Sequence, residues 1–102
     1  MVATVLLLPV LPVRAGQTFK IVALGDSLTA GYGLPPEDTF TTRPEQRLQT
    51  NGLNVEVINA GVSGDTSKAG LARVDWSVPD GTGLVIVELG ANDALRGISP
   101  DQ

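Results

Sequence analysis

The chain has 102 residues, of which 42% are hydrophobic and 18% are charged, with a formal net charge of -4. This length fits one globular domain or part of one, and the composition excludes a disordered chain. Because the sequence has no cluster of basic residues, we expect no nucleic-acid partner. The absence of cysteine and histidine removes thiolate chemistry, sulfur-based zinc sites and the side chain that most often serves as a general base.

The first predicted element is an apolar segment, residues 1–15. Its hydrophobic run over 2–13 is too short to cross a bilayer as a helix, so we expect no stable membrane insertion. Its length and the small residues before position 16 are typical of a secretory signal peptide, here without the usual basic start. We therefore predict a signal peptide over 1–15 and a periplasmic or secreted location. A buried strand is the alternative, which Pro9 and Pro12 disfavour because neither can donate to a ladder.

Short apolar runs alternate with helical stretches after this segment, which is typical of successive βα units in a parallel sheet. Valine and isoleucine gather in the three predicted strands, which are residues 19–24, 55–58 and 84–89. One helix is predicted within 37–50, starting near Thr42. Another is predicted over 66–74, with Thr66 or Asp65 as its cap.

The C-terminus carries one more helix signal, because Ser99 and Pro100 have the form of a cap and a first helical residue. The pattern therefore breaks off within a βα unit. We expect residues 16–102 to be the N-terminal part of a single domain.

Each predicted strand leads directly into a loop of small and polar residues. In a parallel sheet the carboxyl ends of the strands share one edge, where open α/β folds bind ligands. Residues far apart in the sequence are therefore expected to meet there. The three loops are residues 25–31, 59–66 and 90–97.

Ser27, in the first loop, is the candidate nucleophile. A serine between a buried strand and a helical turn projects its hydroxyl from the sheet edge, and its own N–H faces the same space. The plain structural alternative is that Ser27 caps a helix beginning at Leu28. A phosphate-binding loop is a third interpretation, but the sequence matches neither the dinucleotide glycine pattern nor the pattern containing lysine.

Gly61 and Asn92, in the other two loops, are candidate donors to an oxyanion. Gly61 has no side chain, so a substrate oxygen could approach its N–H, and Asn92 could donate from its carboxamide. Considered alone, Gly61 is more simply a turn glycine with positive φ, and Asn92 a turn former. Together with Ser27 they favour a nucleophile with an oxyanion hole.

These loops resemble three conserved blocks of the SGNH hydrolases, also called the GDSL esterase family. The resemblance rests on IVALGDSLTAGYG, NAGVSGDTS and GANDALRG, and it covers residues 20–100. Bacterial periplasmic arylesterases, thioesterase I and lysophospholipase L1 form the most similar branch. The resemblance implies an α/β fold of the flavodoxin-like three-layer α/β/α type, with a parallel sheet that is incomplete at the C-terminus and with no metal or organic cofactor.

The resemblance also implies an activity. Ser27 is then the nucleophile that forms an acyl-enzyme, and the Ser27 N–H, the Gly61 N–H and the Asn92 side chain form the oxyanion hole. The implied substrates are small carboxylic esters, thioesters or lysophospholipids. No obligate protein partner is implied.

One departure from the family limits this expectation. The Asp-x-x-His block that supplies the rest of the triad is absent, and loss of a triad serine or histidine lowers kcat by about 10⁶. Asp26, Asp65 and Asp93 lie near the loops, but an ordinary aspartate is a weak base toward an alcohol. We therefore expect these 102 residues alone to be inactive. The alternative to a partial esterase is a non-catalytic remnant that at most binds acyl or ester ligands, and a nucleotide-binding domain is a third hypothesis.

Three acidic residues and the last strand give structural expectations. Asp26 and Asp93 follow turns with glycine, and we expect them to accept backbone N–H bonds that fix the loops. Glu88 interrupts an apolar strand, and the sequence offers no clear partner for it. The strand over 84–89 is expected to expose hydrophobic side chains at an open edge, which predicts a marginal, association-prone chain.

Overall fold

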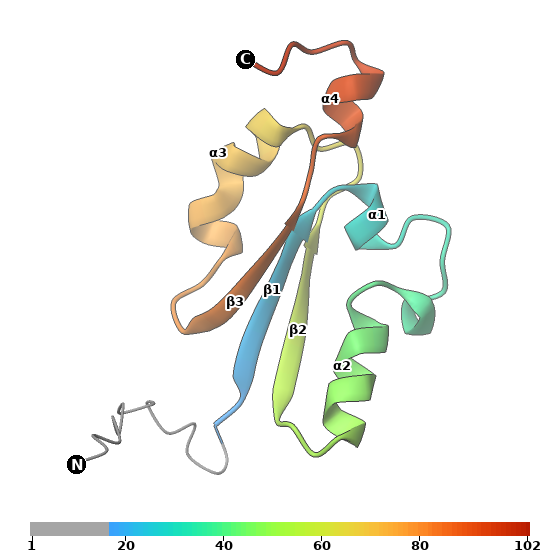
Figure 1. Cartoon of the computed structure of the whole chain (residues 1–102), viewed down its shortest axis with the longest axis vertical. Helices are drawn as coiled ribbons and strands as arrows, with labels where there is room; N and C mark the ends of the chain where they lie inside the picture. The colour runs from blue at the N-terminus through green and yellow to red at the C-terminus, as the bar shows by residue number, and fades with distance from the viewer. Residues whose placement is uncertain (1–16) are drawn as a thin grey trace, which may run out of the picture.

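The computed structural model describes residues 17–102, so the predicted signal peptide lies outside the described residues. Strands β1 (Phe19–Gly25), β2 (Val55–Gly61) and β3 (Thr82–Glu88) form one parallel sheet in the order β2-β1-β3 (Figure 1). The α/β class and the parallel sheet expected from the sequence are therefore confirmed.

β1 is the central strand and forms most of the core. Val22 is fully buried, and its neighbours in the strand are at most 8% exposed as far as Leu24. Gly25, which ends β1, lies in register with Gly61 of β2 and with Glu88 of β3. The carboxyl ends of all three strands therefore share one edge, as the βα pattern predicts.

The predicted strands are all present, but their ends differ from the expectation. β2 continues three residues beyond 58, because Asn59 to Gly61 stay paired with β1 although they are poor strand formers. β3 begins at Thr82 and ends at Glu88, not over 84–89. Hydrophobicity marks the middle of each strand, whereas pairing with β1 decides where it ends.

The two predicted helices are present. α2 (Thr42–Thr50) begins at the expected residue. α3 (Ser67–Ser77) is capped by Thr66, whose Oγ1 accepts the Ala69 N–H at 3.2 Å, and it runs three residues beyond the predicted end. Near Ser99 the described residues form a turn in which the Gln102 N–H donates to the Ser99 carbonyl, and the predicted helix start there stays a prediction.

Three short elements add to the two predicted helices. They are α1 (Ser27–Ala30), the 3₁₀ turn η1 (Pro36–Asp38) and α4 (Ala91–Leu95). α4 forms within the third loop because Gly90, with φ 121°, turns the chain sharply out of β3. Asn92 therefore lies on a helical turn and not in an open loop.

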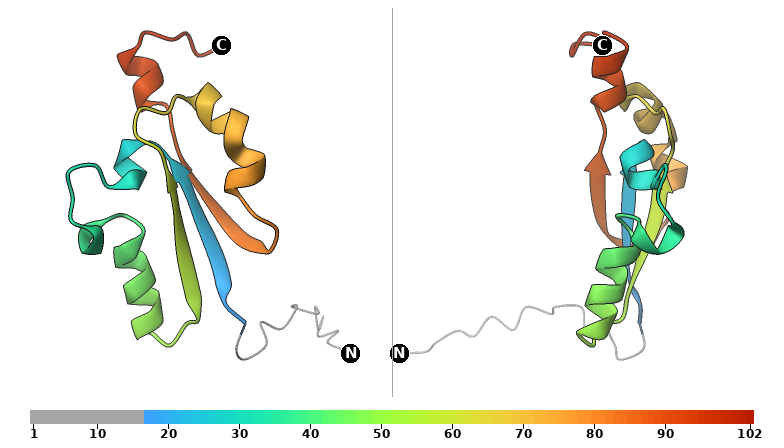
Figure 2. Two further views of the ribbon diagram at one scale, coloured as in Figure 1. Left: turned by 180° about the vertical axis from the view of Figure 1, so that it is seen from behind. Right: turned by 90° about the vertical axis from the view of Figure 1, so that its right-hand side faces the viewer.

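Helices cover both faces of the sheet. α1 and α2 contact β2, and α3 contacts β1. The connections β1–β2 and β2–β3 cross the sheet in opposite directions, so right-handed crossovers place their helices on opposite faces. The edge-on view in Figure 2 shows α2 and α3 on the two sides of the sheet.

The two outer strands differ in how their edges are covered. On β2, the Val57 N–H donates to Glu45 at 2.8 Å, and the Val55 carbonyl accepts from Gln49 at 3.0 Å, so α2 protects this edge. On β3, Leu84 is 48% and Val87 is 62% exposed. The exposed hydrophobic strand is confirmed, and association of the chain stays a prediction.

Within residues 17–102, no helix is long and apolar enough to span a membrane.

Candidate active site

The turn after β1 places Ser27 at the start of α1. Asp26 is the cap of this helix, and its Oδ1 accepts the Leu28 N–H at 3.0 Å. The capping role considered for Ser27 is therefore wrong. The Ser27 side chain is partly exposed and, within residues 17–102, forms no hydrogen bond. Its hydroxyl is thus positioned by the backbone alone.

Gly25 allows α1 to begin directly after the strand. A Cβ on this residue would lie 2.1 Å from Thr29 Oγ1 and 2.8 Å from the Glu88 carbonyl oxygen. Both distances are far below van der Waals contact. The turn that carries Ser27 therefore requires glycine at position 25 for space.

Gly61 ends β2 against the backbone of α1. A Cβ there would lie 2.3 Å from the Ala30 nitrogen, and Gly61 does not have positive φ. The interpretation as a turn glycine is therefore wrong, because close packing against α1 is what requires it. The Gly61 N–H donates to Asn59 Oδ1 at 2.9 Å, and Asn59 Nδ2 donates to the Thr29 carbonyl at 3.0 Å. Asn59 thus links the end of β2 to the turn that carries Ser27.

Asn92 is held against the loop that follows β2. Its Nδ2 donates to the Asp65 carbonyl at 3.0 Å. This bond uses one of the two amide hydrogens, since a carboxamide nitrogen carries two donors. The third loop is thereby attached to the second.

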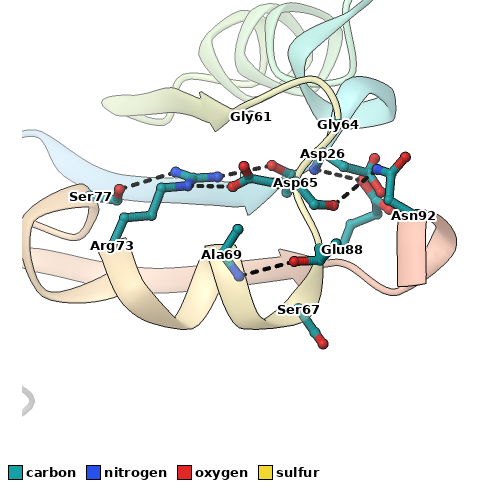
Figure 3. A network of polar contacts seen from close by, with 12 residues as sticks. Asp26, Gly61, Gly64, Asp65, Ser67, Ala69, Arg73, Ser77, Glu88 and Asn92 are labelled. Carbon is teal, nitrogen blue, oxygen red and sulfur yellow. Dashed lines mark hydrogen bonds and ion pairs between the residues drawn. The ribbon is translucent and has the colours of Figure 1, made fainter. Parts of the chain in front are cut away.

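Arg73 of α3 joins the first loop to the second (Figure 3). Its Nε lies 2.6 Å from Asp65 Oδ2, its Nη2 donates to the Gly25 carbonyl at 3.0 Å, and its Nη1 donates to Ser77 at 3.1 Å. The two charged side chains are only 9% and 13% exposed. One buried guanidinium thus ties the end of β1 to the loop after β2, and Asn92 binds that same loop.

Sequence reasoning missed Arg73 as part of the site. Its bonds reach eight residues back to Asp65 and 48 residues back to Gly25. The only available signal was a single arginine among the small and apolar residues of a predicted helix. Such an arginine in a half-buried helix face needs an acidic partner, but Asp75 and Asp80 are both nearer to Arg73 in the sequence than Asp65 is.

Asp26 and Asp93 accept backbone N–H bonds, as predicted. Asp26 is 1% exposed and binds the Leu28 N–H, while its Oδ2 has no partner within the described residues. Asp93 accepts the N–H of Ser67 at 2.7 Å and its hydroxyl at 2.6 Å. These two hydrogen bonds lower the pKa of Asp93. Asp93 therefore joins α4 to the start of α3.

The lowered pKa of Asp93 predicts a local acid sensitivity. A carboxylate with a depressed folded-state pKa adds stability above its ordinary pKa of 3.8 and loses it as the pH falls through the lower folded value. We expect the amide resonance of Ser67 to stay constant above pH 5 and to shift only below about pH 4. An NMR titration checks this, with Asp93→Asn as the control that abolishes the shift. A Ser67 transition above pH 5 would contradict it.

Glu88 has partners that the sequence did not reveal. Its Oε1 accepts the Thr29 hydroxyl at 3.0 Å and the Asp26 N–H at 3.4 Å. The expectation of no clear partner is therefore corrected. Both donors lie in the turn after β1, 59 and 62 residues earlier in the chain.

Beside this edge, a cavity of about 490 Å³ opens between the start of α3 and α4. It is lined by Thr66, Ser67, Lys68, Asp93, Arg96, Ile98 and Gln102. Within residues 17–102, no group of three acidic side chains is arranged to hold a metal ion. Ser27, Gly61 and Asn92 are not among the residues that line this cavity.

Comparison with known proteins identifies the family. The model of the GDSL-like Lipase/Acylhydrolase family matches residues 23–102. The chain is 47% identical to an arylesterase of Vibrio mimicus over 85 residues, which are 79% of this chain and 41% of the relative. It is 42% identical to esterase TesA of Pseudomonas aeruginosa over 89 residues, covering 86% and 43%. It is 39% identical to thioesterase 1/protease 1/lysophospholipase L1 of Escherichia coli K12 over 98 residues, covering 95% and 46%.

Solved structures agree with this comparison. The SGNH-hydrolase family esterase AlinE4 superposes with a TM-score of 0.78 at 49% identity, over 85% of this chain and 48% of that one. The esterase EstA of Pseudoalteromonas sp., solved as inhibited by monoethylphosphonate, gives 0.71 at 37% identity, over 78% and 44%. The chain belongs to the GDSL-like lipase/acylhydrolase family, whose structural neighbours here are SGNH esterases. It spans less than half the length of these relatives.

Proposed function

We propose that this chain supplies the nucleophile and the oxyanion hole of a hydrolase that cleaves carboxylic esters or thioesters. The observation that carries the proposal is the joining of the three loops at one sheet edge. Arg73 binds both the Gly25 carbonyl and Asp65, and the Asp65 carbonyl accepts from Asn92. Ser27 lies two residues after Gly25. The bonds from Arg73 and Asn92 therefore hold the loop that carries Ser27 in a fixed position relative to Asn92.

In the proposed reaction, Ser27 Oγ attacks the carbonyl carbon of the ester. The negative oxygen of the tetrahedral intermediate accepts bonds from the Ser27 N–H, the Gly61 N–H and the free amide hydrogen of Asn92. The Gly61 N–H donates to Asn59 Oδ1, so the Asn59 side chain must release this N–H before it can donate to the oxyanion. The leaving group departs with a proton, and water then hydrolyses the acyl-serine.

The hydroxyl proton of Ser27 needs an acceptor that these residues do not provide. The 102 residues contain no histidine, and an ordinary carboxylate is a weak base toward an alcohol. We propose that the base comes from outside these residues, since the curated relatives are more than twice as long as the part matched. On their own the 102 residues are then inactive or nearly so.

The substrate and the location are proposed from the relatives. Their names include arylesterase, esterase, thioesterase and lysophospholipase, which supports small esters, thioesters or lysophospholipids as substrates. We further propose a signal peptide over residues 1–15, part of a single hydrolase domain over 16–102, and a periplasmic or secreted location. Neither nucleic acid nor an obligate protein partner is part of the proposal.

A non-catalytic remnant that binds acyl or ester ligands is the second candidate. The lack of any histidine in the 102 residues favours it for this chain by itself. The two candidates differ in one measurable property. A remnant binds the ligand without forming a covalent bond to Ser27.

The proposal is tested by labelling the chain with a reactive alkyl phosphonate while imidazole in solution replaces the missing base. We expect slow labelling of Ser27 that accelerates with imidazole concentration, because imidazole accepts the hydroxyl proton. Ser27→Ala should remove the label completely. Mass spectrometry of the peptides locates the phosphonate.

Ser63→Ala is the matched control, because Ser63 is an exposed serine in the loop after β2. It should label at the wild-type rate. Labelling that survives in Ser27→Ala would overturn the serine mechanism. Saturable binding of an ester without any labelling of Ser27 would support the remnant.

A further inference from the structure

Glu88 is an acidic residue at the end of an otherwise uncharged strand. β3 reads Thr-Gly-Leu-Val-Ile-Val before it. A partly buried carboxylate costs free energy unless hydrogen bonds compensate for its lost hydration. The proposed reaction gives Glu88 no role, so its place in the structure needs another explanation.

The two donors that bind Glu88 lie on either side of the nucleophile. Its Oε1 accepts from the N–H of Asp26, which precedes Ser27, and from the hydroxyl of Thr29, two residues after it. Asp26 is 1% and Thr29 is 2% exposed, so both partners are fixed by the surrounding core. One carboxylate oxygen therefore holds the backbone before Ser27 and the helical turn after it.

The strand that carries Glu88 also carries an oxyanion-hole donor. β3 ends at Glu88, and only three residues separate it from Asn92 on α4. The Glu88 carbonyl oxygen lies 2.8 Å from the position that a Gly25 Cβ would occupy. The backbone and the side chain of Glu88 therefore both lie against the turn that carries Ser27. Any shift of the turn relative to β3 is thus a shift of Ser27 relative to Asn92.

We propose that Glu88 is a positioning residue that sets the placement of Ser27 relative to Asn92 by accepting hydrogen bonds from Asp26 and Thr29. The inference rests on the proposed function, because it assigns Glu88 to the alignment of that nucleophile. The acceptor oxygen is what matters. A glutamine at this position keeps that oxygen, and an alanine removes it.

The test compares two pairs of variants in the full chain under the labelling conditions described above. Glu88→Ala and Thr29→Val remove the hydrogen bond from either side. Their rates of Ser27 labelling should fall by about 10- to 100-fold, since a misplacement of about 1 Å can lower a rate by as much as about 100-fold. Glu88→Gln and Thr29→Ser keep the acceptor and the hydroxyl, and should label at close to the wild-type rate. Glu56→Ala, an exposed glutamate at the far end of β2, is the control that should label normally.

Amide hydrogen exchange of residues 26–30 provides a readout that needs no reactive serine. Exchange in this segment should accelerate in Glu88→Ala and Thr29→Val and stay unchanged in the two conservative variants. If Ser27 of the wild type is not labelled, the proposed function fails. Amide hydrogen exchange of residues 26–30 then still tests whether Glu88 holds the turn that carries Ser27. The inference is overturned if Glu88→Ala labels and exchanges like the wild type, or if Glu88→Gln loses as much as Glu88→Ala.

Discussion

Replacement of Arg73 by methionine is expected to destabilise the fold by about 3–5 kcal/mol, the usual cost of breaking a buried ion pair from one side. Methionine has a similar length, so the apolar packing of α3 is largely kept. The Asp65 carboxylate would stay in a site where it is 13% exposed, and the Gly25 carbonyl would lose its bond to Arg73. Urea unfolding followed by circular dichroism measures the change in the free energy of unfolding.

Arg43 provides the matched control for this experiment. It forms an ion pair with Asp38, but its side chain is 69% exposed. An exposed pair contributes about 0–1 kcal/mol, so Arg43→Met should change the free energy of unfolding by no more than that. Adding Asp65→Asn to Arg73→Met should restore part of the loss, because the stranded charge is removed. Equal effects of Arg43→Met and Arg73→Met would contradict the importance of the buried pair.

Gly61→Ala is expected to be the next most damaging change. The new Cβ would lie 2.3 Å from the Ala30 nitrogen and 2.7 Å from its Cα, and these are backbone atoms that cannot rotate away. The end of β2 and α1 must separate, at a cost of about 1–3 kcal/mol or more for overpacking. Because α1 begins with Ser27, we expect phosphonate labelling to slow as well.

Gly52→Ala separates backbone strain from crowding. Gly52 has φ +84°, and no atom lies within 4 Å of its would-be Cβ, so only the cost of a left-handed alanine applies, about 1–2 kcal/mol. Its labelling rate should match that of the wild type. An unfolding midpoint for Gly61→Ala equal to that of the wild type would show that β2 and α1 are not in close contact.

The parts of the fold that depend on local pattern were predictable from the sequence. The apolar runs located all three strands, and the threonines at 42 and 66 located the starts of α2 and α3. The meeting of the three loops at one edge follows from parallel pairing alone. What the pattern did not predict were the added length of β2, which pairing with β1 sets, and α4, which begins where Gly90 turns the chain out of β3.

The candidate site was predictable to the same extent. Ser27, Gly61 and Asn92 were selected for the chemistry of their groups and for their places after the strands. Only the alternative interpretation of Gly61 as a turn glycine with positive φ was wrong, because its contact with α1 comes from a segment 31 residues away and leaves no local pattern. Two contacts were missed because they are distant in the sequence: the Gly25 carbonyl lies 48 residues from Arg73, and Thr29 lies 59 residues from Glu88.

The central claim is that Ser27, Gly61 and Asn92 direct their groups toward one carbonyl oxygen. A crystal structure of the chain after phosphonate labelling tests it most directly. We predict phosphorus bonded to Ser27 Oγ, with a phosphonyl oxygen within hydrogen-bond distance of both the Gly61 nitrogen and Asn92 Nδ2. A phosphonate on Ser27 whose oxygens reach neither donor, or a phosphonate on another residue, would contradict the claim.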